Sequence, residues 1–138
     1  MPGWLAPTAF VGACLTVWVA IALRNSRQQI ARTLARRRNP SRAEFVELMR
    51  PDTTEATANF VWDTAAIYLQ PRLAPHPDDD LVRDLPIDDG DWSMDWPREF
   101  ADLHGFSEMD YPDWPEGAAV TLRNYGRWLE AGLRAPNG

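Results

Sequence analysis

Lysine is absent from this chain of 138 residues, and all 14 of its basic residues are arginines. Its absence excludes enzymes that form a Schiff base with lysine and enzymes whose phosphate-binding loop depends on one. Cys14 is the only cysteine, which excludes an internal disulfide framework and a cysteine-based zinc cluster. The sequence also lacks a Gly-x-Ser-x-Gly segment and a glycine-rich phosphate loop. These absences predict a protein that is not an enzyme and has no catalytic residues.

Acidic residues are scarce in the first part of the chain, and basic residues are scarce in the rest. Residues 1–50 hold eight arginines and only two acidic residues, which gives a net charge of +6. Residues 51–138 hold six arginines and 18 acidic residues, which gives a net charge of −12. Such an asymmetry indicates that the two parts face different environments or different partners.

The start of the chain has the length and composition of a membrane anchor. Residues 2–23 carry no charge, and as a helix they would extend for about 33 Å, close to the hydrocarbon thickness of a bilayer. We therefore predict a single transmembrane helix that contacts membrane lipid through residues 2–23. Two alternatives compete with this prediction: a buried helix of a soluble protein, and a signal peptide that is cleaved after Ala22.

A cluster of arginines follows the apolar segment. Six arginines lie within residues 24–38, and such a cluster resists translocation, so the C-terminal part is expected in the cytoplasm. The exclusive use of arginine suggests a GC-rich bacterial genome, and hence the bacterial inner membrane. We predict that residues 24–38 continue the helix and contact anionic lipid headgroups; the alternative is that these arginines only fix the topology. Nucleic acid is not expected as a partner, because the tethered domain downstream is acidic.

Apolar patterns separated by proline predict a helical body. Asn39-Pro40 ends the first helix, and a capping box at Ser41–Glu44 begins the next. Further helices are predicted at about residues 54–70, from 93–96 to 104, and at 118–133. Their apolar faces are expected to include Leu48, Tyr68, Leu103 and Val120. The sequence thus predicts an all-α protein with three parts: a transmembrane anchor (1–23), a basic juxtamembrane helical linker (24–50) and an acidic helical domain (51–138).

Three short motifs within residues 54–133 resemble those of an acyl carrier protein. They are the acidic element Asp84–Asp88, the pair Glu99-Phe100 in the second helix, and the segment Thr121–Tyr125 at the start of the last helix. More narrowly, the segment resembles a family of small bacterial proteins of unknown function that is classed as acyl-carrier-like. The resemblance implies a small acyl-carrier-like helical bundle, with a long loop after its first helix and a second helix that serves as a docking surface.

A working carrier needs a serine at the start of the second helix to receive a phosphopantetheine arm. The resemblance places that serine near position 89, where this chain has an aspartate. Ser93 is the nearest hydroxyl group, about one turn later, and it is the candidate attachment site for phosphopantetheine. The alternative is that Ser93 caps the helix, which is a common role for a serine before an apolar run.

Between Asp78 and Glu116, 14 acidic residues face only two arginines. This density would steer a basic partner toward the domain, although an ordinary solvated surface is the alternative. The resemblance assigns partner binding to aspartates around the second helix, namely Asp88, Asp89, Asp91, Asp95 and Asp102. No metal site is expected, because an EF-hand loop centred on Gly90 would have apolar residues at its ligand positions. The two histidines, at positions 76 and 104, also lack a second ligand at suitable spacing.

The sequence supports three hypotheses. The first is a non-enzymatic, membrane-anchored, acyl-carrier-like binding module that presents an acidic surface to a basic protein partner and needs no cofactor. The second is a true acyl carrier that is modified by phosphopantetheine on Ser93. The third is a membrane-tethered immunity protein that neutralises a basic toxin, since small acidic proteins suit that task electrostatically.

Overall fold

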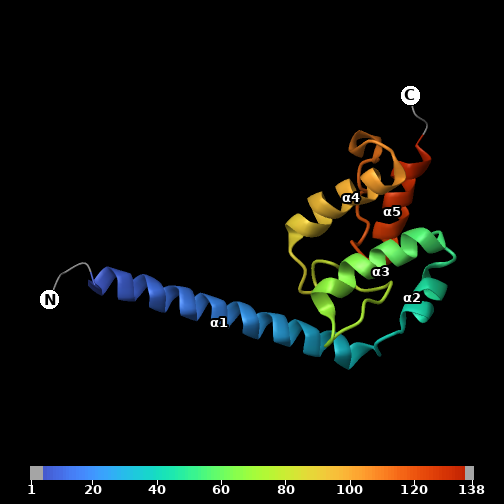
Figure 1. The fold of residues 1–138 in the computed structure, drawn as a ribbon. Coiled ribbons are helices and arrows are strands. Elements are labelled where there is room, and N and C mark those ends of the chain that lie inside the picture. Colours follow the sequence, from blue (N-terminus) through green and yellow to red (C-terminus); the bar gives the residue numbers. More distant parts are fainter. Residues whose placement is uncertain (1–4, 136–138) are drawn as a thin grey trace.

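Five α-helices dominate residues 5–135, the part of the chain that the computed structural model describes (Figure 1). They are α1 (Leu5–Arg36), α2 (Arg42–Met49), α3 (Glu55–Leu69), α4 (Trp96–His104) and α5 (Leu122–Arg134). A π-helical turn, η1 (Asp91–Asp95), precedes α4, and a 3-10 turn, η2 (Glu108–Asp110), follows it. The described residues form no strand, so the all-α prediction is confirmed. Residues 1–4 of the predicted anchor lie outside the described part.

Helix α1 projects from a body that the other helices form (Figure 1). Its segment Thr8–Arg36 is long and apolar enough to cross a membrane, and none of its most apolar stretch is buried. Phe10, Leu15 and Trp18 each keep more than half of their surface exposed. The core helix of a soluble protein would be mostly buried, so that alternative is wrong. The N-terminal helix also continues without a break into the arginine cluster, as the sequence predicts, but it ends at Arg36, two residues before the predicted end.

The core of the body is built by α2, α3, α4 and α5. Phe45 and Met49 of α2, Val61 of α3, Phe100 of α4 and Leu129 of α5 are fully buried. Their rings and aliphatic chains supply the apolar burial that stabilises a domain of this size. Residues 42–49, which the sequence places in the linker, therefore contribute directly to the core.

Local signals set several helix ends. The Ser41 hydroxyl accepts a hydrogen bond from the Glu44 amide (3.2 Å), so α2 begins at the predicted cap. Helix α4 ends at Gly105, which adopts a left-handed conformation (φ +72°) that favours glycine. Both ends agree with the sequence prediction.

The last helix begins later than predicted, at Leu122 instead of residue 118. Residues 118–121 are outside the helix because the backbone there pairs with the loop before α4. The Leu81 amide donates to the Val120 carbonyl (2.8 Å), and the Leu122 amide donates to the Asp79 carbonyl (3.0 Å). Thr121 then caps α5 through the Asn124 amide (3.1 Å). Val120 therefore belongs to an extended segment, although it continues the apolar spacing of the helix.

The apolar face predicted for the helix that ends at residue 104 is buried only in part. Trp96 and Phe100 are buried, but Leu103 is exposed. Leu48 and Tyr68 are also more exposed than their positions in the predicted apolar faces suggest.

Gly132 of α5 packs closely against the aromatic side chains of Phe106 and Tyr111, in the loop between α4 and α5. A Cβ atom at this position would lie 2.5 Å from Cδ1 of Tyr111 and 2.9 Å from Cε2 of Phe106. The Tyr111 ring cannot easily move, because it stacks on Trp128 (4.3 Å between centroids) and its hydroxyl donates to the Pro97 carbonyl (2.7 Å). The close approach therefore requires glycine.

We predict that Gly132→Ala lowers the free energy of unfolding of the body by about 1–3 kcal/mol, since overpacking forces the aromatic rings apart. Urea unfolding in detergent, followed by tryptophan fluorescence, measures this change. Gly90→Ala is the matched control, because a Cβ there would meet only Asp88 Oδ1 at 4.0 Å. Equal stabilities of the two variants would contradict the prediction.

Candidate functional site

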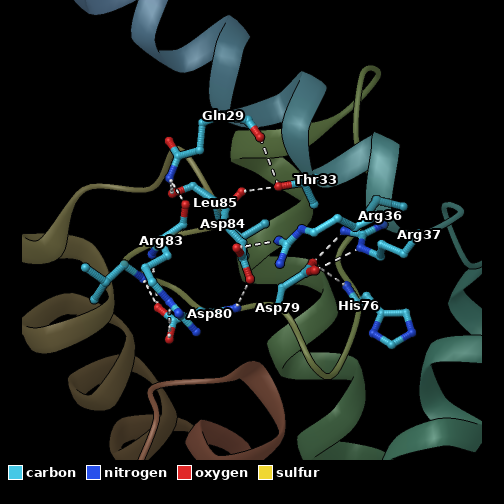
Figure 2. Close-up of polar contacts among 12 residues, drawn as sticks. Gln29, Thr33, Arg36, Arg37, His76, Asp79, Asp80, Arg83, Asp84 and Leu85 are labelled. Carbon is cyan, nitrogen blue, oxygen red and sulfur yellow. Dashed lines mark hydrogen bonds and ion pairs between the residues drawn. The ribbon is translucent and has the colours of Figure 1, made fainter.

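A polar contact joins the C-terminal part of α1 to the loop between α3 and α4 (Figure 2). The Gln29 side-chain amide donates to the carbonyl oxygens of Arg83 (2.9 Å) and Leu85 (3.1 Å). One turn later, the Thr33 hydroxyl lies 2.8 Å from the Asp84 carbonyl. We call this the α1–loop contact; together with these side chains it comprises Arg36 at the end of α1, Arg37 directly after it, and their aspartate partners.

Arg37 and Asp79 form the most buried ion pair of this contact. Arg37 Nε donates to Asp79 Oδ1 (2.8 Å) and Nη2 donates to Oδ2 (2.5 Å), a two-pronged geometry that strengthens the pair. Only 14% of the Arg37 side chain and 4% of the Asp79 side chain are exposed. The same Nη2 also donates to the Ala74 carbonyl (2.8 Å), so the guanidinium group holds the loop at two points.

Arg36 and Asp84 form a second, more exposed ion pair, with 2.5 Å between Nη2 and Oδ1. The other carboxylate oxygen of Asp84 accepts the Asp80 amide (2.8 Å), and Asp80 in turn accepts the amides of Val82 (2.8 Å) and Arg83 (3.0 Å). These carboxylates therefore shape the loop as well as holding α1. Since three buried aspartates are used internally, the surface available to a partner is smaller than the count of acidic residues suggests.

Burial raises the pKa of Asp79 above its ordinary value, because the charged form loses hydration. The hydrogen bonds and charge of Arg37 oppose this rise, and the backbone amide of His76 also donates to the carboxylate (2.9 Å). The ionisation of Asp79 is therefore coupled to the presence of Arg37.

Asp78, Asp79 and Asp80 serve three different partners. Asp78 pairs with Arg123 of α5 (3.1 Å), whereas its two neighbours hold α1 and the loop. The three carboxylates therefore do not converge on one point. In the part of the chain that the structure describes, no group of three or more histidine, cysteine or acidic side chains is arranged to hold a metal ion.

The aspartates that the sequence assigns to partner binding lie on η1, on α4 and just before them. Asp88, Asp89, Asp95 and Asp102 are exposed, and Asp91 is half-buried. Glu99 joins them, because its spacing of four from Asp95 and three from Asp102 places all three on one face of the helix. Glu99 was not predicted as a site residue from the sequence, although its spacing from Asp95 and Asp102 was enough to place it on the same face. We call the six residues the η1–α4 acidic surface.

A shallow hollow of about 340 Å³ lies on this surface, lined by Asp95, Arg98, Glu99, Asp102 and Leu103. Arg98 does not neutralise the carboxylates around it, because its Nε pairs with Glu108 (3.0 Å). Leu103 is 67% exposed, and Met94 on η1 is 60% exposed. The surface therefore combines negative charge with accessible apolar side chains.

Ser93 lies within η1, and its exposed hydroxyl donates to the Asp89 carbonyl (2.5 Å). It does not cap α4, because Asp95 occupies the residue before the helix and makes no capping hydrogen bond. The interpretation of Ser93 as a helix cap is therefore wrong. The hydroxyl instead stabilises the π-helical turn.

Comparison of the chain with protein-family models, with curated proteins and with solved structures finds no match. The site must therefore be interpreted from its own geometry and charge.

We predict that Arg37→Gln lowers the free energy of unfolding of the body by about 3 kcal/mol at neutral pH, because it leaves Asp79 charged and buried without its partner. In this variant only His76 still opposes the effect of burial, so the pKa of Asp79 rises further and the carboxylate takes up a proton at a higher pH. The loss of stability should therefore shrink as the pH falls through that pKa. Urea unfolding of the full chain in detergent at several pH values measures both effects.

Arg36→Gln is the matched control. Its side chain is 59% exposed, so solvent screens the ion pair, and we expect a loss below about 1 kcal/mol with little dependence on pH. A loss in Arg37→Gln that is equally small, or that is constant between pH 4 and 8, would show that the Arg37–Asp79 pair does not hold α1 to the body.

Proposed function

We propose that this protein is a non-enzymatic, membrane-tethered binding module whose η1–α4 acidic surface docks a basic protein partner. The observation that carries the proposal is the grouping of six carboxylates without an ion-pair partner on η1, on α4 and just before them. Among the described residues, nine acidic side chains make ion pairs, but none of the six on the η1–α4 acidic surface does. Unpaired carboxylates at this density repel one another, and a basic partner would relieve that repulsion.

The arrangement of charge and apolar surface favours binding over simple solubility. Long-range attraction by the carboxylates would speed the encounter with a basic partner. Met94 and Leu103 would then provide apolar area that is buried only in the complex, which is where much of the affinity of an interface arises.

The resemblance to acyl carrier proteins suggests the same surface, because the second helix of those proteins docks their partners. In this chain, η1 and α4 are the helical elements that follow the long loop after α3. The proposal does not depend on phosphopantetheine.

The tether belongs to the proposal as well. We infer that α1 crosses the bacterial inner membrane and that the arginines after it keep the body in the cytoplasm. The α1–loop contact would then hold the body close to the membrane surface. Gln29 follows Leu23, the last residue of the uncharged segment, by six residues, or about 9 Å of helix.

Neutralising the acidic surface should weaken binding of a basic probe. We predict that the triple variant Asp95→Asn, Glu99→Gln, Asp102→Asn binds a fluorescent octa-arginine peptide about tenfold more weakly than wild type at low salt, since each exposed charge contributes up to about 1 kcal/mol. Fluorescence anisotropy with the full chain in detergent measures the affinity, and 0.5 M salt should abolish the difference.

The control replaces three acidic residues that are also exposed and unpaired but lie elsewhere, in the variant Glu55→Gln, Asp113→Asn, Glu116→Gln. It has the same net charge as the test variant. Equal weakening in both variants would refute the η1–α4 acidic surface as the docking site, because the peptide would then respond only to total charge.

The topology is tested separately by reporters fused to the C-terminus. We expect a green fluorescent protein fusion to be bright and an alkaline phosphatase fusion to be inactive, because the first folds in the cytoplasm and the second needs the periplasm. The fluorescent fusion should sediment with the membrane and require detergent for extraction. An active phosphatase fusion, or full-length protein in the aqueous fraction, would contradict the proposed tether.

A further inference from the structure

The part of α1 that follows its apolar segment has two different faces. Gln29, Thr33 and Arg37 point toward the body, where they form the α1–loop contact (Figure 2). At about 100° per residue, Arg24 and Arg27 lie on the opposite side of the helix. Both are exposed, and neither takes part in an ion pair within the described residues. The fold therefore uses some arginines internally and leaves these two directed outward.

These two arginines line a shallow groove of about 500 Å³ along α1, together with Ala20, Leu23, Gln28 and Ala31. Arg24 and Arg27 are three residues apart, so their side chains start from neighbouring positions on the helix surface. The end of the groove toward the N-terminus is apolar, and the two guanidinium groups and the Gln28 amide follow it, between Leu23 and Ala31. This polarity follows the helix axis, with the apolar end inside the candidate membrane span.

We propose that this groove binds an anionic phospholipid, with its phosphodiester between Arg24 and Arg27 and the start of one acyl chain along Ala20 and Leu23. Arginine suits this ligand because its planar guanidinium group donates two parallel hydrogen bonds to phosphate oxygens. The Gln28 amide supplies a further donor for the headgroup. The ligand matches the groove in both chemistry and direction, since a phospholipid also changes from polar to apolar along its length.

The position of the groove favours a lipid over a protein. The inference rests on the proposed membrane tether: Arg24 directly follows Leu23, the last residue of the uncharged segment, so its guanidinium group lies at the level of the headgroups when α1 spans a bilayer. The body occupies the opposite side of the helix and leaves the groove open to lipid. The sequence prediction that all the arginines of residues 24–38 contact headgroups is thereby narrowed, because Arg36 and Arg37 are engaged with aspartates.

The test uses the full chain, purified in a non-ionic detergent and stripped of lipid. Native mass spectrometry follows the binding of phosphatidylglycerol and, separately, of phosphatidylcholine. We expect wild type to bind phosphatidylglycerol in preference, and Arg24→Gln/Arg27→Gln to bind it about thirtyfold more weakly, as two arginines at about 1 kcal/mol each imply. Arg50→Gln/Arg72→Gln is the control, because it removes two exposed arginines that lie outside the groove, and it should bind like wild type.

Each other outcome overturns the proposal. Equal affinity of wild type for the two lipids, or equal weakening in the control variant, would leave no anionic lipid site on α1. Displacement of phosphatidylglycerol by millimolar inorganic phosphate would assign the groove to free phosphate instead. A dimer that depends on Arg24 and Arg27, in the absence of lipid preference, would assign it to the acidic surface of a second copy. The substitutions replace exposed side chains, and circular dichroism checks that helix content is unchanged.

Discussion

The buried pair between Arg37 and Asp79 fixes how the rest of the molecule is arranged. It joins a helix that is apolar for most of its length to a body that is rich in acidic residues, across 42 positions of sequence. Neither group is stable in the interior alone, because an unpaired buried charge costs several kcal/mol. Arg37 therefore holds the loop between α3 and α4 in place, and that loop leads directly into η1 and the acidic surface. The position of the candidate docking surface relative to α1 depends on this pair together with the other bonds of the α1–loop contact.

The pairing also changes the meaning of the charge asymmetry in the chain. A basic first part and an acidic remainder predict two separate environments, but arginines of the first part form ion pairs with aspartates of the remainder within the same molecule. The charged residues that remain without an ion pair lie on separate surfaces. Arg24 and Arg27 face away from the body, and the carboxylates of η1 and α4 lack any arginine partner in the described chain. Two outward surfaces of opposite sign result, one on α1 and one on η1 and α4.

Local features of the fold could be predicted from sequence, whereas contacts between distant segments could not. The Ser41 cap and the end of α4 at Gly105 follow from preferences of single residues, and α1 follows from the length of an uncharged run. The predicted start of α5 was wrong because residues 118–121 pair with a loop about 40 positions earlier. A contact between such distant segments leaves no periodic pattern in the sequence. In the site, five aspartates of the acidic surface were assigned from the resemblance to acyl carrier proteins, whereas the pairing of Arg37 with Asp79 depends on tertiary structure alone.

The unbroken course of α1 has a mechanical consequence. A helix without a proline or glycine kink between its apolar stretch and Arg37 acts as a stiff rod, and the body is fixed to the end of that rod. In a bilayer, a change of hydrocarbon thickness alters the tilt of a spanning helix. Because the two parts turn together, any such tilt would swing the carboxylates of α4 through the same angle. Membrane thickness would thereby set which direction the negatively charged side of the protein points.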